Sequence, residues 1–184
     1  MSASSPSVDA VTAPALRPRD VQRARVYRAE DAWSGRLEAA RQGAGLATVG
    51  GSRVLLPAER RFGTLETAAE HAARVVALPA VTTVFGPVDP PRLRLRRGTR
   101  QAHWESPGVI ALPVPRHGEP WGLRETVLLH ELAHHVGETT GTTAAHAAPY
   151  PAVLLLLVGA TLGPEAELAL RVAYGEERVE VGAL

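Results

Sequence analysis

Apolar side chains recur at every third or fourth position in two stretches of the first half of the chain, and this spacing predicts two helices. The first helix runs from Asp20, which can act as its N-cap, to about Arg41. The second runs from Thr64, a second capping residue, to Leu78, and Pro79 is expected to end it.

Shorter apolar segments predict strands. Residues 47–49 and 53–56 flank two glycines, which is typical of a β-hairpin with a tight turn. Residues 92–96 alternate strictly between arginine and leucine, which predicts a strand with one face in solvent. Residues 102–105 and 109–112 are two further strand candidates, separated by a Pro-Gly turn.

Three helices are expected in the last third of the chain. One starts near Pro120 and ends at Gly137, the second is the apolar segment 149–162, and the third runs from Glu165 to about Tyr174. The order of helices and strands predicts an α+β fold.

Composition indicates one globular domain over residues 19–184 of the 184-residue chain, because 45% of the residues are hydrophobic. Residues 1–18 are rich in Ser, Ala and Pro and predict a disordered N-terminal tail.

No signal-peptide pattern is visible at the N-terminus. The apolar run 152–162 is too short for a bilayer span, which needs about 20 residues. A cytoplasmic location is therefore expected.

The net charge and the cysteine content limit which classes of function and which metal ligands fit this chain. A net charge of +1 gives no electrostatic reason to expect binding to nucleic acid or to a membrane. The chain has no cysteine, so any metal ion must be held by His, Asp or Glu.

One motif indicates chemistry. His130, Glu131 and His134 form the pattern H-E-x-x-H within the predicted third helix. Residues four apart lie on the same helix face, so both imidazoles can bind one ion. Glu131 lies about 100° round the helix from His130, where it can act as general base toward a water at the metal. These residues predict a Zn²⁺ site.

A catalytic zinc takes three protein ligands, so a third must come from elsewhere. In the longer pattern H-E-x-x-H-x-x-G-x-x-H the last histidine would stand at position 140, but that residue is Thr140. No aspartate follows the motif, so an aspartate downstream cannot be the third ligand. We favour His146, which lies among alanines in the following loop. The alternatives are Glu138, Glu165, Glu167 and the glutamates after residue 175.

Five segments stand out together: RDVQRARVYRAEDAW, LPAERRFGTLETAAEHAARVVALP, VLLHELAHHV, AAHAAPYPAVLLLLV and GPEAELALRVAYGEERV. In these segments, which cover most of residues 19–180, the chain resembles a family of small actinobacterial zinc metallohydrolases. More distantly it resembles SprT-like zincin metallopeptidases. In these families a segment after the motif typically reads His-Gly-Pro-x-Phe. Here the histidine and aromatic keep their spacing as His146 and Tyr150, but the glycine is absent.

The resemblance implies a zincin-like fold, in which a small mixed or antiparallel sheet packs against the active-site helix and two helices follow. It supports His146 as the third ligand. The function expected is a zinc-dependent hydrolase, in particular a metallopeptidase, with a peptide or protein substrate. An extended peptide is expected to pair with strand 109–112. For Tyr150, a packing role is favoured over oxyanion binding.

Two other functions fit the residues. A zinc-stabilised binding module without activity has no need of a base such as Glu131. A DNA-associated protein would use the arginines of the Arg92–Arg100 strand, which the low net charge does not favour. Among the remaining histidines, His71 is expected to face solvent and His135 to support the site or lie at the surface, while packing explains His103 as well as a function does.

Overall fold

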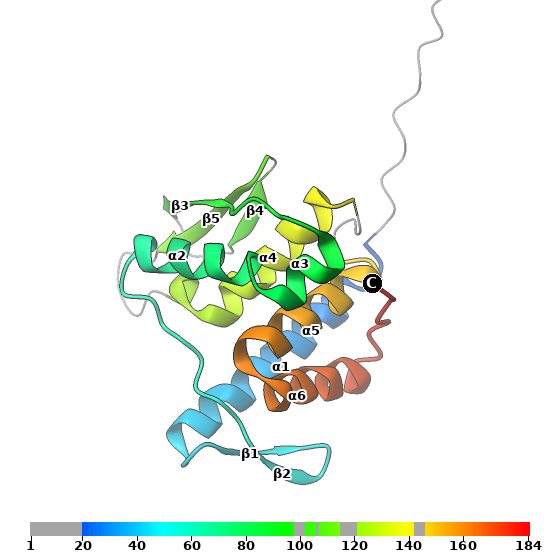
Figure 1. Ribbon diagram of the computed structural model, residues 1–184. Helices are drawn as coiled ribbons and strands as arrows, with labels where there is room; N and C mark the ends of the chain where they lie inside the picture. Colours follow the sequence, from blue (N-terminus) through cyan, green and yellow to red (C-terminus); the bar gives the residue numbers. More distant parts are fainter. Residues whose placement is uncertain (1–19, 98–101, 106, 115–120, 142–145) are drawn as a thin grey trace, which may run out of the picture.

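The computed structural model describes residues 20–97, 102–105, 107–114, 121–141 and 146–184. The predicted tail 1–18 lies outside these residues, as do Arg100 and Pro120. The described part has the expected α+β architecture, with its three-stranded sheet at one end and a hairpin at the other (Figure 1). Its elements are α1 (Arg23–Gln42), β1 (Leu46–Val49), β2 (Ser52–Leu55), α2 (Leu65–Val76), α3 (Pro79–Phe85), β3 (Arg92–Arg97), β4 (His103–Glu105), β5 (Val109–Val114), α4 (Glu125–Thr139), α5 (Pro149–Leu162) and α6 (Pro164–Glu176), with a 3₁₀ turn at Trp121–Leu123.

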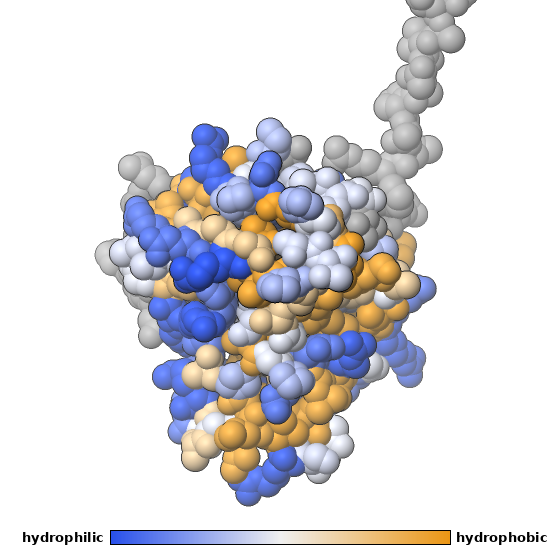
Figure 2. All heavy atoms as spheres, viewed as in Figure 1, coloured by the Kyte–Doolittle hydropathy of each residue, from blue (hydrophilic) through white to orange (hydrophobic). Residues whose placement is uncertain are grey.

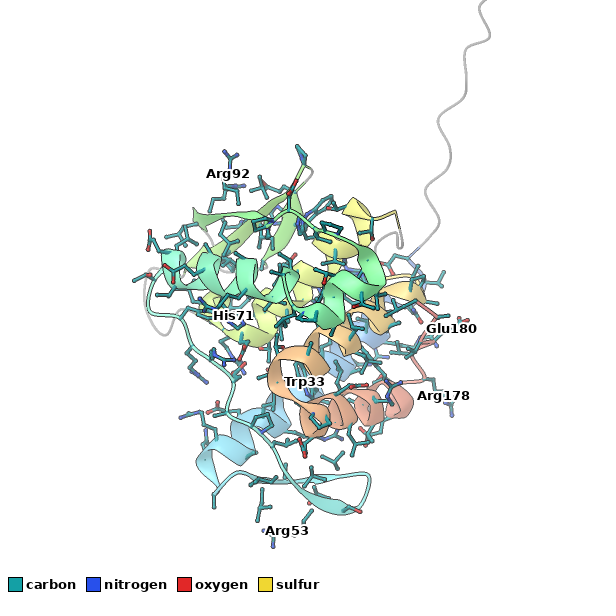
Figure 3. The ribbon with its side chains drawn as sticks, in the orientation of Figure 1. Trp33, Arg53, His71, Arg92, Arg178 and Glu180 are labelled. Atoms are coloured by element: carbon teal, nitrogen blue, oxygen red, sulfur yellow. The ribbon has the colours of Figure 1, made fainter. Side chains whose placement is uncertain are left out.

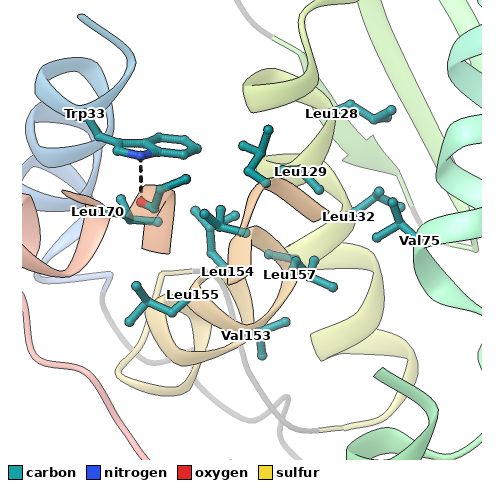
Figure 4. Packing of buried hydrophobic residues seen from close by; sticks show 14 of the residues in the cluster. Trp33, Val75, Leu128, Leu129, Leu132, Val153, Leu154, Leu155, Leu157 and Leu170 are labelled. Carbon is teal, nitrogen blue, oxygen red and sulfur yellow. Dashed lines mark hydrogen bonds between the residues drawn. The ribbon is translucent and has the colours of Figure 1, made fainter. Parts of the chain in front are cut away.

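Helix α5 is the centre of the helical layer. It is apolar all the way round, as expected for a helix that is covered on every side. It packs against α4 on one side and α6 on the other, and α1 packs against α6. Leucines from α4, α5 and α6 fill the space between these helices (Figure 4). Among the described residues, no helix has the length and apolar character needed to cross a membrane.

Trp33 of α1 packs against α6 and is hydrogen-bonded to it. Its side chain is 1% exposed, and its indole nitrogen donates a hydrogen bond to the carbonyl oxygen of Ala166 at 3.1 Å (Figure 4). Burying an aromatic ring with its polar atom satisfied is stabilising, because the ring leaves water and no hydrogen-bond donor is lost. Helix α1 is thereby held along the side of the molecule where the site described below is built.

The sheet is mixed, with strand order β3-β5-β4. Strand β5 pairs with β3 in parallel and with β4 in antiparallel fashion. The alternation predicted for β3 is met only in part, because Leu93 is buried but Leu95 is 50% exposed. The hairpin of β1 and β2 forms at the two glycines as expected. It lies against α6, and hydrophobic side chains gather over this part of the surface (Figure 2).

Three predicted helix boundaries were wrong. Helix α4 begins at Glu125 and not near Pro120, because residues 121–123 form a 3₁₀ turn before it. Asp20 does not cap α1, which begins at Arg23 after Gln22. Pro79 does end α2, but it also begins the short helix α3, because proline is well accommodated in the first turn of a helix. Gly137 lies within α4, which continues to Thr139.

The N-terminal end of α4 is fixed by a buried carboxylate. The side chain of Glu125 is 0% exposed, accepts hydrogen bonds from the backbone N–H and the guanidinium of Arg60, and lies 2.9 Å from Nε2 of His71. The prediction that His71 faces solvent was therefore wrong, since this imidazole is 5% exposed and lies between α2 and α4 (Figure 3).

Glu125 is expected to make stability depend on pH in the acidic range. Burial works to raise the pKa of its carboxyl, but His71 and Arg60 outweigh burial and hold the pKa below 4.5. The contribution of Glu125 to the free energy of unfolding is thus complete above pH 4.5 and is lost as the pH falls through the lower, folded pKa. Urea unfolding from about pH 6 to about pH 3 measures this loss. A Glu125→Gln variant that lost as much stability over this range as the wild type would contradict the assignment.

Candidate metal centre

Three histidines from two segments meet at one point. Helix α4 holds His130 and His134 on one face, and the chain returns before α5 to bring in His146. One ring nitrogen from each lies within 4.8 Å of the other two. The ring of His134 also packs face to edge against those of His130 and His146, with centroids 4.7 Å apart for His134 and His146. The grouping of His130, His134 and His146 expected from the sequence is present in the structure, and it can hold a metal ion.

The other ligands considered do not join this cluster. Glu138 is exposed in the last turn of α4. Glu165 is exposed in the first turn of α6, and Glu167 is bound to Arg171 one turn further along the same helix. Of the described residues, His130, His134 and His146 are the group identified as able to surround an ion.

Carboxylates orient two of the imidazoles. Nδ1 of His130 lies 2.6 Å from Oε2 of Glu30, and Nδ1 of His146 lies 2.7 Å from Oδ2 of Asp20. Each contact occupies Nδ1 and leaves Nε2 of the same ring available as a ligand. Histidines that bind metals in proteins usually have such a partner, which fixes the tautomer and the ring direction.

Nε2 of His146 has no hydrogen-bond partner among the described residues although it is buried. Burying a polar nitrogen without a partner costs free energy, so a bound ligand at this nitrogen would explain its position. The other two imidazoles are within 4.8 Å, and no donor group for this nitrogen is present among the described side chains. The arrangement therefore fits a divalent cation.

Glu30, on α1, contacts side chains from three other helices, α4, α5 and α6, at the site. Its carboxylate accepts hydrogen bonds from the hydroxyl of Tyr174 at 3.1 Å and from that of Tyr150 at 3.3 Å, while its other oxygen faces His130. Tyr150 is completely buried, its hydroxyl also lies 2.7 Å from Nδ1 of His130, and its ring stacks on His134. The tyrosine hydroxyl is thus directed at the supporting side of the imidazole, which favours the packing role.

The side chain of Glu131 is buried and lines a cavity together with His130. Burial raises the pKa of this carboxyl to about 7, although the positive charge of His130 and the backbone N–H of Trp104, which donates a hydrogen bond to it, act in the opposite direction. A carboxylate with a pKa near neutrality can accept and release a proton under ordinary conditions.

The imidazoles differ in their affinity for protons. Burial, followed by His130 and His146, lowers the pKa of His134 to about 2, so this ring is neutral. Burial also lowers the pKa of His146 despite Asp20. Burial would lower the pKa of His130 as well, but Glu30 outweighs it and raises the pKa. The lowered pKa values favour the neutral, metal-binding form of His134 and His146, whereas the raised pKa of His130 makes metal binding at this ring compete with protonation.

His135 follows the motif but cannot join the cluster. Its Nδ1 accepts a hydrogen bond from the indole N–H of Trp104 at 3.2 Å, and its Nε2 donates to the carbonyl oxygen of Asp89 at 2.8 Å. Both ring nitrogens are therefore used, and the buried ring connects α4 with β4. This agrees with the supporting role expected for it.

A cavity of about 370 Å³ opens beside His130 and Glu131. One wall comes from α1 and the other from α4, with Ala102 and Trp121 at its edge. Its lining residues are Tyr27, Glu30, Asp31, Trp33, Ser34, Ala102, Trp121, Thr126, Val127, His130 and Glu131. The volume is in the range of small-molecule and side-chain pockets.

Strand β5, which the sequence suggested would pair with a peptide substrate, has no free edge for it. Strand β5 lies between β3 and β4 and is paired along both edges, so the expected pairing of a peptide with residues 109–112 was wrong. In the described part of the chain, the outer edge of β4 has no partner strand.

The arginines of β3 are partly neutralised. Arg94 forms an ion pair with Glu105 of β4, and Arg96 contacts the His103 ring at 2.5 Å, while Arg92 projects outward (Figure 3). Because the carboxylate of Glu105 offsets the charge of Arg94 and the net charge of the chain is only +1, the strand gives little support to a DNA-binding function.

Comparison of the chain with protein-family models, with curated proteins and with solved structures gave no match. The family resemblance noted in the sequence therefore stays a prediction.

Proposed function

We propose that the protein is a zinc-dependent hydrolase with a zincin-like catalytic centre, and that its reaction is the hydrolysis of peptide bonds. The observation that supports this most strongly is the buried, unpartnered Nε2 of His146, which lies with ring nitrogens of His130 and His134 in a group 4.8 Å across. The residue proposed as general base, Glu131, lines the cavity together with His130.

Zinc is the ion that this ligand set favours. Zinc accepts imidazole nitrogen readily, whereas calcium and magnesium prefer oxygen ligands. Three protein ligands are the number found in catalytic zinc sites, while structural sites are closed by four. When bound, a catalytic zinc supplies a Lewis acid and a water molecule of lowered pKa.

The protein residues account for proton transfer and positioning. Glu131 takes a proton from the attacking water and passes it to the leaving amine, and the N–H of Trp104 holds the carboxylate in place between the two steps. Glu30 and Asp20 keep the imidazoles of His130 and His146 in fixed orientations. The open edge of β4, next to this carboxylate, is suited to pairing with an extended peptide.

The proposal is tested with the full-length protein, a mixture of unmodified peptides and mass spectrometry. We expect cleavage products with the zinc-loaded protein, none after treatment with a chelator, and recovery when zinc is returned. Stoichiometric zinc without any hydrolysis, of peptides or of other amide and ester substrates, would favour the zinc-stabilised binding module instead.

Glu30→Gln is expected to weaken zinc binding by about 10- to 100-fold, because His130 loses the carboxylate that orients its ring. Competition with a chromophoric chelator measures this affinity. Glu70→Gln, the same change on the exposed face of α2, serves as the control and should bind zinc as tightly as the wild type. Equal affinity of the two variants would show that Glu30 does not support the metal site.

A further inference from the structure

The cavity beside Glu131 is a groove between two helices. Tyr27, Asp31 and Ser34 are spaced four and three residues apart on α1, so they form a stripe along one wall. On the opposite wall, Thr126 and Val127 precede the metal-binding turn of α4 by one helical turn. The groove therefore leads directly from the catalytic carboxylate along α1, and it is placed to take a group of the substrate next to the bond that is cleaved.

Asp31 is the unbalanced charge in this groove. The other carboxylate of the α1 wall, Glu30, is engaged by His130. At the Ser34 end, the guanidinium of Arg124 is paired with the buried Glu59. By contrast, Asp31 is exposed and forms no hydrogen bond or ion pair with another described residue. Apart from the catalytic carboxylate of Glu131, the described lining of the groove thus has one carboxylate, Asp31, that no described cation balances.

The remaining lining is suited to an apolar stem. Ala102 and Val127 are aliphatic, and Trp121 presents an indole at the edge of the groove. The indole is held by the 3₁₀ turn, in which Gly122 approaches the carbonyl oxygen of Pro113 so closely that a Cβ atom would clash. A tryptophan ring attracts cations as well as hydrocarbon. Long basic side chains combine these two requirements, because their stems are apolar and their ends are charged.

We propose that the groove is a specificity subsite for a lysine or arginine side chain of the substrate, with Asp31 as the residue that selects for positive charge. The hydrocarbon stem lies against Trp121 and Val127, and the cationic end reaches the Asp31 carboxylate. This inference rests on the proposed peptidase function and adds the class of side chain that the enzyme prefers.

Cleavage kinetics test the selectivity. Peptides that differ only in one residue, lysine or its uncharged analogue norleucine, are compared at each position around the cleavage site. At one position we expect kcat/KM to favour lysine about fivefold, as for a partly exposed ion pair. Asp31→Asn should bring the ratio close to one, and the control Glu70→Gln should leave it unchanged. Equal rates for lysine and norleucine in the wild type at every position would overturn the inference while the hydrolase proposal stood.

A binding measurement keeps the inference testable if no peptide is cleaved. Blocked lysine and blocked norleucine amides are titrated into the full-length protein and followed by NMR. We expect lysine to shift the indole resonance of Trp121 and the amide resonance of Asp31 at lower concentration than norleucine does, and Asp31→Asn to remove the difference. Shifts that are absent from the groove, or equal for the two amides, would overturn the inference independently of any catalytic activity.

Discussion

Replacing Glu131 with glutamine is expected to leave zinc bound and to lower kcat by about 10²- to 10⁴-fold, the range contributed by a general base. Glutamine has nearly the same shape and can still accept the hydrogen bond from Trp104, but it cannot take up a proton. The metal ligands His130 and His134 are unchanged, so metal content is expected to stay at one ion per chain. Metal analysis and single-turnover kinetics on the same preparation separate the two effects.

The matched control is Glu138→Gln, the same change on an exposed residue of the same helix. It should keep both the metal and the activity. If Glu131→Gln retained full activity, the carboxylate would have no part in proton transfer, and the proposed mechanism would be wrong even with the metal in place.

His146→Ala is expected to remove stable zinc binding. The variant keeps His130 and His134 but loses the ligand supplied by the loop before α5, and two imidazoles do not complete a catalytic site. In the wild type, zinc at a concentration 100 times its Kd should add about 2.7 kcal/mol to the free energy of unfolding, and the variant should lose this gain. Thermal unfolding with and without zinc measures it.

His103→Ala tests the specificity of that result, because this imidazole is exposed on β4 and outside the cluster. It should bind zinc like the wild type. Unchanged zinc stabilisation in His146→Ala would show that another residue is the third ligand.

Local patterns in the sequence were sufficient for most helices and for the central motif. Helix α5 matches its predicted range, because a continuous apolar run between Pro149 and Gly163 allows few other structures. The capping residue Thr64 and the two glycines of the hairpin act over a few residues, so their effects were predictable. His146 was favoured because it lies among small residues in the loop after the motif and fits the family resemblance, while several downstream glutamates stayed open as alternatives.

The supporting residues of the site could not be predicted, because they depend on contacts between distant parts of the chain. Asp20 precedes His146 by 126 positions, and its place before a helix suggested a cap instead. Glu30 interacts with residues 100 to 144 positions away, so its role is seen only once the fold brings α1 to His130, Tyr150 and Tyr174. The same holds for His71, whose buried partner Glu125 lies at the start of another helix.

X-ray absorption at the zinc edge, measured on the purified zinc-loaded protein, examines the proposed metal centre without relying on a substrate. The account predicts three imidazole nitrogens at about 2.0–2.1 Å, together with one oxygen ligand from solvent. A spectrum with fewer than three imidazoles, or protein that takes up no zinc at neutral pH, would contradict the claim that His130, His134 and His146 bind one catalytic ion.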